Sequence, residues 1–284
     1  MINMRDLDET SITEAVVSKV TQGGSARAKQ INEAVVRHLH DLCRELELTE
    51  EEWEYAIDFL TRTGHMCSDT RQEFILLSDA LGVSMLVDAI NHRHPGDTTE
   101  TTVFGPFFVE NAPEVTSGAD ISGRLDGKPL LIEGAIRDEA GNPVAGAVVD
   151  IWHADEDGFY DVQLEGGEAG GRGRVLTDET GSFHLSSIVP SPYPIPDDGP
   201  VGQMLGVQGR HPYRPAHVHF MVRADGFRRL VTHLFIEGSD YLDSDVVFGV
   251  KDSLIKPIEW IEPGSGSTGG GHYLLRADIR LAPA

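Results

Sequence analysis

The hydrophobic pattern of the chain changes near residue 95, and this change constrains the fold more than any other feature. Before it, apolar residues recur every three or four positions, in runs from Ile31 to Leu46 and from Trp53 to Leu60. Two shorter runs, 74–81 and 84–90, also predict helices. After residue 95, short β-branched runs alternate with Gly- and Pro-containing turns. The sequence therefore predicts a helical N-terminal region followed by β structure.

The β-rich part contains six runs of strand length. They cover residues 130–136, 144–152, 173–177, 181–185, 217–223 and 230–235. Because turns rather than helices separate most of these runs, an antiparallel β-sandwich is favoured over a βαβ fold. The predicted fold class is α+β, with a helical region over residues 1–100 and a β-sandwich domain over residues 101–284.

Charge and composition exclude several classes of partner. The chain has 23 basic and 46 acidic side chains and a formal charge of −23, whereas nucleic acids and anionic membranes attract basic patches. No run approaches the roughly 18 apolar residues of a membrane span, and the first residues lack the basic flank of a signal peptide. Cys43 and Cys67 are too few for a disulfide framework. We expect a soluble cytoplasmic protein without nucleic acid or membrane insertion.

Two histidines, His217 and His219, stand two positions apart in a predicted strand. Because strand side chains alternate between faces, both imidazoles point the same way, about 6.5–7 Å apart along the strand. An ordinary polar strand face gives the same pattern, so the pair alone decides nothing. Tyr160 lies in a turn, and Tyr193 lies in a loop stiffened by four prolines. Together these residues suggest a site of two tyrosines and two histidines.

Such a donor set selects its metal by charge. A free tyrosine has a pKa near ~10, so two phenolates at neutral pH require a strongly Lewis-acidic ion. Tyrosine-ligated haem iron is one example. Ferric iron therefore fits this set, and zinc fits poorly. A hydrolytic zinc site is a weaker alternative, because the sequence lacks the carboxylate and histidine pattern of that class.

Three segments carry a resemblance to a known family. They are 134–160, which ends in Gly-Phe-Tyr, the Pro-rich loop 190–196, and Arg-Pro-Ala-His-Val-His at 214–219. In these segments and their order the chain resembles the intradiol ring-cleavage dioxygenases, over nearly its whole length. The resemblance implies one Fe(III) per subunit. Tyr160 and His217 would be equatorial ligands, and Tyr193 and His219 axial ligands.

The resemblance also implies a reaction. A catechol-type diol would bind through both oxygens as a dianion and react with O2 to give a muconate. Tyr193 would be displaced and take up a proton, which makes it a catalytic residue as well as a ligand. Arg214 would stabilise negative charge that develops on the substrate, as a fixed cation in a dry site can. A structural salt bridge is the alternative role for Arg214.

Within the family, the runs 150–163 and 190–204 most resemble members that act on hydroxyquinol, benzene-1,2,4-triol. Its product, 3-hydroxy-cis,cis-muconate, tautomerises to maleylacetate in aromatic catabolism. Asp79 would accept the third hydroxyl and so discriminate against catechol. An exposed helix acid is the alternative for Asp79. The implied pocket consists of Leu76, Asp79, Val103, Phe104, Gly105, Pro106, Phe107, Ile195, Pro196 and Val247.

His233 departs from the pattern, because catechol-cleaving members typically carry glutamine there. We expect it beside the ligands rather than as a fifth one. Catechol or a chlorocatechol is the alternative substrate, and a non-catalytic β-sandwich binding module is the alternative class. A binding module has no need for four donors together with Arg214. The resemblance further implies a homodimer through the N-terminal helices, where family members often hold a phospholipid.

Overall fold

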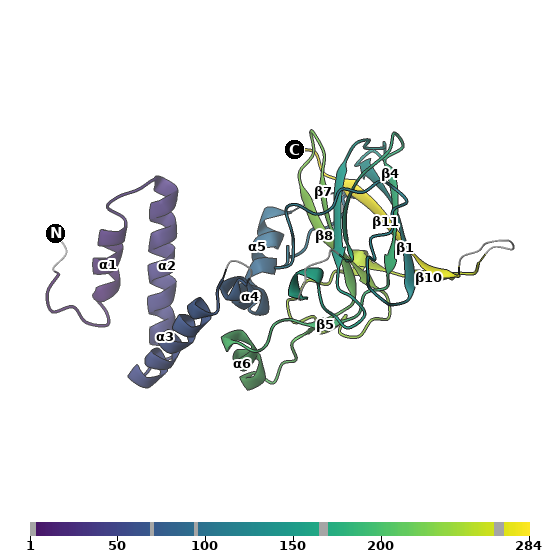
Figure 1. Cartoon of the computed structure of the whole chain (residues 1–284). Coiled ribbons are helices and arrows are strands. Elements are labelled where there is room, and N and C mark those ends of the chain that lie inside the picture. Colours follow the sequence, from purple (N-terminus) through teal and green to yellow (C-terminus); the bar gives the residue numbers. More distant parts are fainter. Residues whose placement is uncertain (1–3, 69–70, 94–95, 165–169, 264–269) are drawn as a thin grey trace. The chain divides into compact units, whose positions relative to one another are not determined.

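The computed structural model describes residues 4–68, 71–93, 96–164, 170–263 and 270–284 (Figure 1). The chain divides into two compact units, Met1–Arg62 and Thr63–Ala284. The first unit contains α1 (Ile12–Val20), α2 (Ala26–Glu45) and most of α3 (Glu50–His65). The helices of the second unit are α4 (Glu73–Ala80), α5 (Val83–Asn91) and α6 (Pro200–Val207). Among the described residues, none of the helices is long and apolar enough to cross a membrane.

Helices α2 to α5 form where the apolar spacing predicts them, whereas α1 and α6 lie outside the predicted runs. Two of the predicted helices begin at polar side chains. The Ser25 hydroxyl accepts a hydrogen bond from the Ala28 amide at the start of α2. At the start of α3, the Thr49 hydroxyl accepts from the Glu52 amide, and the Glu52 carboxylate accepts from the Thr49 amide. These contacts satisfy amide groups that have no partner within the helix.

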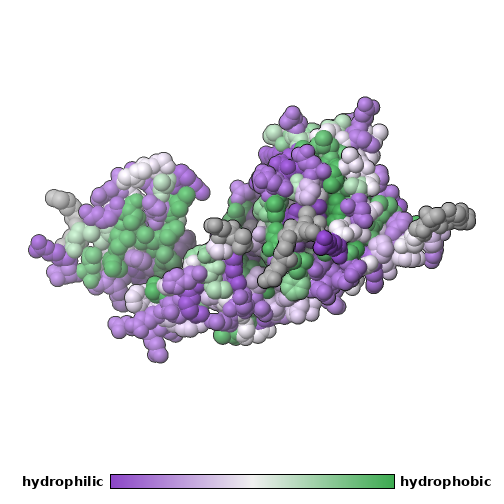
Figure 2. Space-filling model, viewed as in Figure 1, coloured by the Kyte–Doolittle hydropathy of each residue, from purple (hydrophilic) through white to green (hydrophobic). Residues whose placement is uncertain are grey.

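One face of α2 carries an apolar stripe that the first unit leaves uncovered. The stripe comprises Ile31, Val35, Leu39, Leu42 and Leu46, each between 46% and 58% exposed. Apolar residues gather on the surface of this unit in Figure 2. The predicted helical spacing is confirmed, but the stripe does not form the core of the unit.

Two β-sheets face each other in the second unit. One sheet has the order β10-β11-β1-β4, and the other has the order β3-β2-β7-β8-β9. The strands are β1 (Pro129–Asp138), β2 (Val148–His153), β3 (Arg172–Leu176), β4 (Ser182–Ile188), β7 (His217–Arg223), β8 (Leu230–Ile236), β9 (Ile255–Lys256), β10 (Ile258–Ile261) and β11 (His272–Leu281). Fully buried side chains such as Ile132, Ile151 and Phe220 belong to one core cluster. The predicted sandwich is confirmed.

The prediction that the sheets are purely antiparallel is wrong. Strand β1 runs parallel to β11, and β8 runs parallel to β9. Neither pair is joined by a hairpin, which is the connection that enforces antiparallel pairing. The predicted strand at 144–152 also begins too early. Strand β2 starts at Val148, because Gly146 adopts a left-handed φ of 68° in the preceding turn.

Strand pairing brings together residues that are distant in the sequence. On β7, His219 pairs with Trp152 of β2 on one side and with His233 of β8 on the other. A separate two-stranded ribbon, β5 (Tyr193–Pro194) with β6 (Tyr213–Arg214), pairs Tyr193 with Arg214. These registers place the predicted site residues in one region of the second unit.

Gly134 tests the packing of the four-stranded sheet. A Cβ atom there would lie 2.6 Å from the Ala277 carbonyl oxygen and 2.5 Å from Phe183 Cζ. We predict that Gly134→Ala lowers the free energy of unfolding by about 1–3 kcal/mol, because the crowded atoms must move. The measurement is a denaturant titration with a thermal melt.

Gly206 provides the control. It lies in α6 with open space around its Cβ position, and alanine is favoured over glycine in a helix by roughly 1 kcal/mol. Gly206→Ala should therefore leave the Tm unchanged or raise it. Equal losses in the two variants would contradict this account of Gly134.

Candidate metal centre and active site

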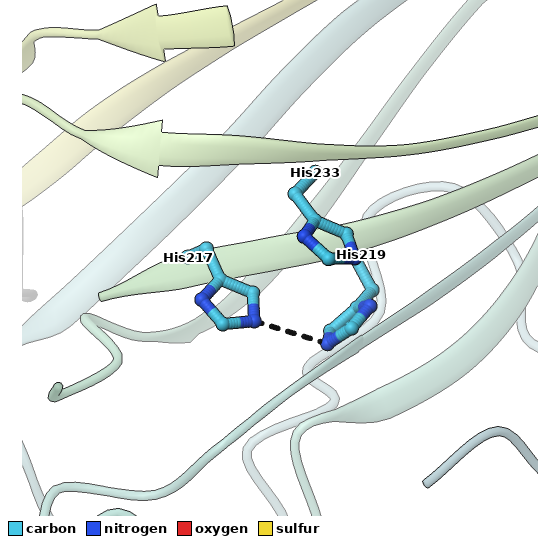
Figure 3. A group of neighbouring side chains, drawn as sticks. All are labelled: His217, His219 and His233. Carbon is cyan, nitrogen blue, oxygen red and sulfur yellow. Dashed lines mark hydrogen bonds between the residues drawn. The ribbon is translucent and has the colours of Figure 1, made fainter. Parts of the chain in front are cut away.

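Three histidine side chains from β7 and β8 lie together in the second unit. Ligand atoms of His217, His219 and His233 all lie within 4.8 Å of one another, and all three side chains are buried. Figure 3 shows His217 and His219 facing each other, with their Nε2 atoms 3.1 Å apart. The His217 and His233 rings stack with centroids 4.7 Å apart. The predicted pair is therefore part of a cluster of three histidines.

Hydrogen bonding fixes which nitrogen of His217 carries the proton. Its Nδ1 lies 2.7 Å from the Pro215 carbonyl oxygen, which only accepts, so Nδ1 carries the proton. The lone pair is then on Nε2. Burial and the Arg214 charge hold the pKa of His217 well below its usual range. The ring is thus neutral, the form in which histidine binds metals.

The two predicted tyrosines approach the same point. Tyr160 Oη lies 2.9 Å from His219 Nε2, and the Tyr160 and Tyr193 rings meet edge to face at 5.2 Å. The Tyr193 ring lies 5.5 Å from the His217 ring. Burial, reinforced by Tyr193, raises the pKa of Tyr160 well above its usual value. Without a nearby cation the Tyr160 phenol would keep its proton, whereas a multivalent cation inverts that preference.

The geometry fits a metal ion. Two atoms bound at right angles to a first-row metal, each about 2.1 Å away, lie about 3 Å apart. The distances from His219 Nε2 are 3.1 Å to His217 Nε2 and 2.9 Å to Tyr160 Oη. In the described part of the chain, His219 Nδ1 is buried without a hydrogen-bond partner. Two neutral imidazoles and two phenols therefore form a buried donor set.

His233 contacts Arg214 as well as the other two histidines. Its Nδ1 accepts a hydrogen bond from Arg214 Nη2 at 3.3 Å, as His217 Nε2 does from Arg214 Nη1 at 3.2 Å. The arrangement agrees with the expectation that His233 stands beside the ligands.

Arg214 is buried next to the donor set. Its Nη1 donates to His217 Nε2 at 3.2 Å, and its Nε donates to Asp245 Oδ1 at 3.1 Å. Burial alone would lower the pKa of Arg214, but the Asp245 carboxylate more than compensates, and the pKa is raised. Arg214 therefore forms a salt bridge with Asp245, which was its alternative role, and contacts His217 at the same time.

Most of the implied pocket is buried. Leu76, Val103, Ile195 and Val247 belong to one apolar cluster, and Phe107 stacks on Tyr160 with centroids 4.4 Å apart. A cavity of about 440 Å³ is lined in part by Asp79, Val103, Phe104 and Gly105. Pro106 is exposed and Pro196 is half-buried, so neither contributes to the buried walls.

Asp79 lies on α4 and is 5% exposed, so it is not an exposed helix acid. Burial raises the pKa of its carboxyl group, and a hydrogen bond with Ser84 opposes that shift. An acid in such surroundings can hydrogen-bond a buried hydroxyl group.

Sequence reasoning missed three supports of the site. The Trp152 ring stacks on His219 at 4.6 Å, and Asp245 binds Arg214. Asp161, directly after Tyr160, accepts from Arg172 Nε at 2.8 Å, and Arg172 Nη2 donates to the Phe107 carbonyl. The only sequence signal for the third support was the position of Asp161, an acid directly after Tyr160.

Comparisons with known proteins show the family of this chain. Residues 103–281 match the family model described as dioxygenase, and residues 25–99 match the one described as catechol dioxygenase N terminus. The 6-chlorohydroxyquinol 1,2-dioxygenase of Cupriavidus pinatubonensis is 52% identical, over 99% of both chains. The hydroxyquinol 1,2-dioxygenase of Nocardioides simplex is 49% identical, over 97% of this chain and 96% of that one.

A solved structure extends the likeness to the fold. The crystal structure of hydroxyquinol 1,2-dioxygenase from Pseudomonas putida DLL-E4 is 46% identical in sequence and superimposes with a TM-score of 0.90. The match covers 97% of this chain and 99% of that one. With its family models, its fold and relatives about half identical along its whole length, the chain belongs to the intradiol ring-cleavage dioxygenases and is an enzyme of that type.

Proposed function

We propose that this enzyme cleaves hydroxyquinol between its vicinal hydroxyls with O2, giving 3-hydroxy-cis,cis-muconate and hence maleylacetate. The observation that carries the proposal is a buried donor set together with a cavity lined by a buried acid, Asp79. Gly105 links the two, because it lines the cavity and lies against the His219 ring. Relatives about half identical over nearly the whole chain are named for hydroxyquinol or its chlorinated form. A chlorinated hydroxyquinol is the second candidate substrate, because the relative with 52% identity is named for one.

The cofactor we propose is one Fe(III) per subunit, held by Tyr160, Tyr193, His217 and His219. The convergence of two neutral imidazoles with two phenols supports it. When bound, ferric iron is a Lewis acid that binds a diolate through both oxygens and withdraws electron density from its ring.

Tyr193 is proposed to hold a proton during the reaction. Its ring is 3% exposed and lies against His217 and Tyr160. Once it is released from the ligand set, its Oη can take the proton of an incoming substrate hydroxyl. Water does not compete for that proton at a buried phenol. The Pro-rich loop keeps the ring close, so that it can return after product release.

Arg214 is proposed to stabilise the negative charge that develops on the ring. Its guanidinium is 2% exposed and faces His217 through Nη1. A fixed cation in a water-poor site stabilises developing charge more than the same cation in water does. The apolar cluster around Val103, Ile195 and Val247 excludes water and suits a flat ring.

The assembly and organisation of the chain are also proposals. We propose a division into residues 1–100 and 101–284, supported by family models that meet between residues 99 and 103. We further propose a cytoplasmic homodimer through the N-terminal helices, with phospholipid as a candidate ligand there. The exposed apolar stripe on α2 supports such an interface.

The visible spectrum tests iron, ligands and substrate together. Phenolate bound to ferric iron absorbs visible light, so the purified iron-loaded protein should be coloured. Hydroxyquinol added without air should shift the band to longer wavelength. When air is admitted, hydroxyquinol should disappear faster than catechol. A colourless protein with full iron content would overturn the two-tyrosine site.

Gly105 tests how tightly the donor set is packed. It has a φ of 76°, and a Cβ atom there would lie 3.0 Å from His219 Cε1. We predict that Gly105→Ala displaces the His219 ring and lowers the iron content at least twofold, measured by elemental analysis.

Gly146 is the matched control, because it has a φ of 68° with open space at its Cβ position. Both alanine variants carry the same backbone strain of roughly 1–2 kcal/mol. Iron loss in the Gly146→Ala variant as well would assign the effect to backbone strain rather than to the ring contact.

Asp79 tests substrate preference. Asp79→Asn should lower the ratio of kcat/KM for hydroxyquinol to that for catechol by about tenfold, since a lost buried hydrogen bond costs about 1–3 kcal/mol. Asp88→Asn is the control, because Asp88 lines the same cavity but binds Thr101. The ratio should not change in that variant. An unchanged ratio in the Asp79 variant would remove this residue from the specificity argument.

A further inference from the structure

The direction of the Arg214 side chain is set by two residues outside the donor set. A guanidinium has five N–H groups in a fixed plane. Three of them donate hydrogen bonds to Asp245 and His233, with donor–acceptor distances of 3.1 to 3.3 Å. The terminal nitrogen Nη1 is left to face His217 Nε2 at 3.2 Å. The orientation of the reactive end of Arg214 therefore depends on what holds the other end.

Asp245 is itself held in place from a second direction. Its Oδ1 accepts from Arg214 Nε and, at 3.3 Å, from the Val247 amide. Its Oδ2 accepts from Arg214 Nη2 at 3.2 Å and from the Gly249 amide at 3.0 Å. The carboxylate is 2% exposed. Because both oxygens bind the guanidinium and the backbone of the 245–249 turn, the planes of the two groups are locked together.

Space around this pair is also closed. A Cβ atom on Gly249 would lie 3.1 Å from Arg214 Nη2 and 3.2 Å from Asp245 Oδ2. The Gly249 carbonyl accepts from the Thr102 hydroxyl at 3.0 Å, which fixes the end of the turn. The guanidinium thus has little room to rotate about its own bonds.

His233 completes the support. Its Nδ1 accepts from Arg214 Nη2, and its ring stacks on that of His217 with an angle of 17° between the planes. It therefore contacts the arginine and one member of the donor set at once.

We propose that Asp245 and His233 are positioning residues that hold Arg214 so that its Nη1 faces the donor set. This inference rests on the proposed function. A residue that acts only by aiming Arg214 has an effect on turnover only while Arg214 is present. A displacement of about 1 Å can cost roughly 100-fold in rate, so the effect should appear in kcat rather than in KM.

The test begins with Asp245→Asn, which keeps the shape of the side chain but removes its charge. We expect kcat for hydroxyquinol to fall about 10- to 100-fold with KM changed less than threefold. Iron content and the visible band of the protein should be retained, because the four donors are untouched.

Asp150→Asn is the matched control. Asp150 is also a buried carboxylate, 1% exposed, and it binds two arginines, Arg174 and Arg223, at 2.6 and 2.7 Å. It stands on β2, and these two salt bridges do not involve Arg214. We expect this variant to lower the Tm and leave kcat unchanged.

A double-mutant cycle separates aiming from general support. In the Arg214→Gln background, Asp245→Asn should cause no further loss of kcat. Equal losses in both backgrounds would overturn the inference, as would an unchanged kcat in the single variant. An iron-loaded wild-type enzyme that does not cleave hydroxyquinol would instead overturn the proposed function.

If Asp245→Asn does not fold, His233 decides the question. His233→Asn offers an amide oxygen near the position of Nδ1, whereas His233→Leu offers no acceptor. The asparagine variant should retain about tenfold more kcat than the leucine variant at equal iron content. Equal kcat values in the two variants would overturn the inference.

Discussion

The register of β7 is the constraint on which the site depends. Val218, Phe220 and Val222 are fully buried in the core between the sheets, and each contributes about 1.5–3 kcal/mol by leaving water. A slip of one residue would move these side chains to the opposite face of the sheet and turn His217 and His219 into the core. The free energy that stabilises the sandwich therefore also orients the two imidazoles toward Tyr160.

Burying this set of polar side chains costs free energy when no cation is bound to them. Burial holds the pKa values of His217 and His219 well below the usual range and that of Tyr160 well above it, so all three groups are uncharged. The fixed charge of Arg214 nearby is compensated by Asp245. A metal ion that accepts imidazole and phenolate ligands would satisfy these groups together, which is why the fold can bury so many polar atoms in one place.

The sequence pattern within a single strand was enough to predict the part of the site that lies on that strand. Alternation along 217–223 predicted both the strand and the common direction of His217 and His219, and β7 has those bounds. Tyr160 and Tyr193 stand in segments without such a period, so spacing left them ambiguous. The histidine pair made them candidates, and the resemblance then gave them their roles. Asp245 gave no signal, because its contact with Arg214 spans 31 residues. The parallel pairing of β1 with β11 was missed for the same reason, since it joins segments more than a hundred residues apart.

The residue proposed to set substrate preference and the proposed metal donors stand on different elements. The donor set lies on β7, on β5 and at Tyr160, whereas Asp79 lies on α4, in a segment that contributes none of these donors. A substitution in α4 can therefore change which ring is bound without altering the ligands. Arg214 joins the two regions electrostatically, because its charge opposes the burial-driven rise in the pKa of Asp79 and lowers that of His217. Any change in how Arg214 is held should thus affect both the charge on the acid and the groups around the ligands, which gives Asp245 influence over both regions.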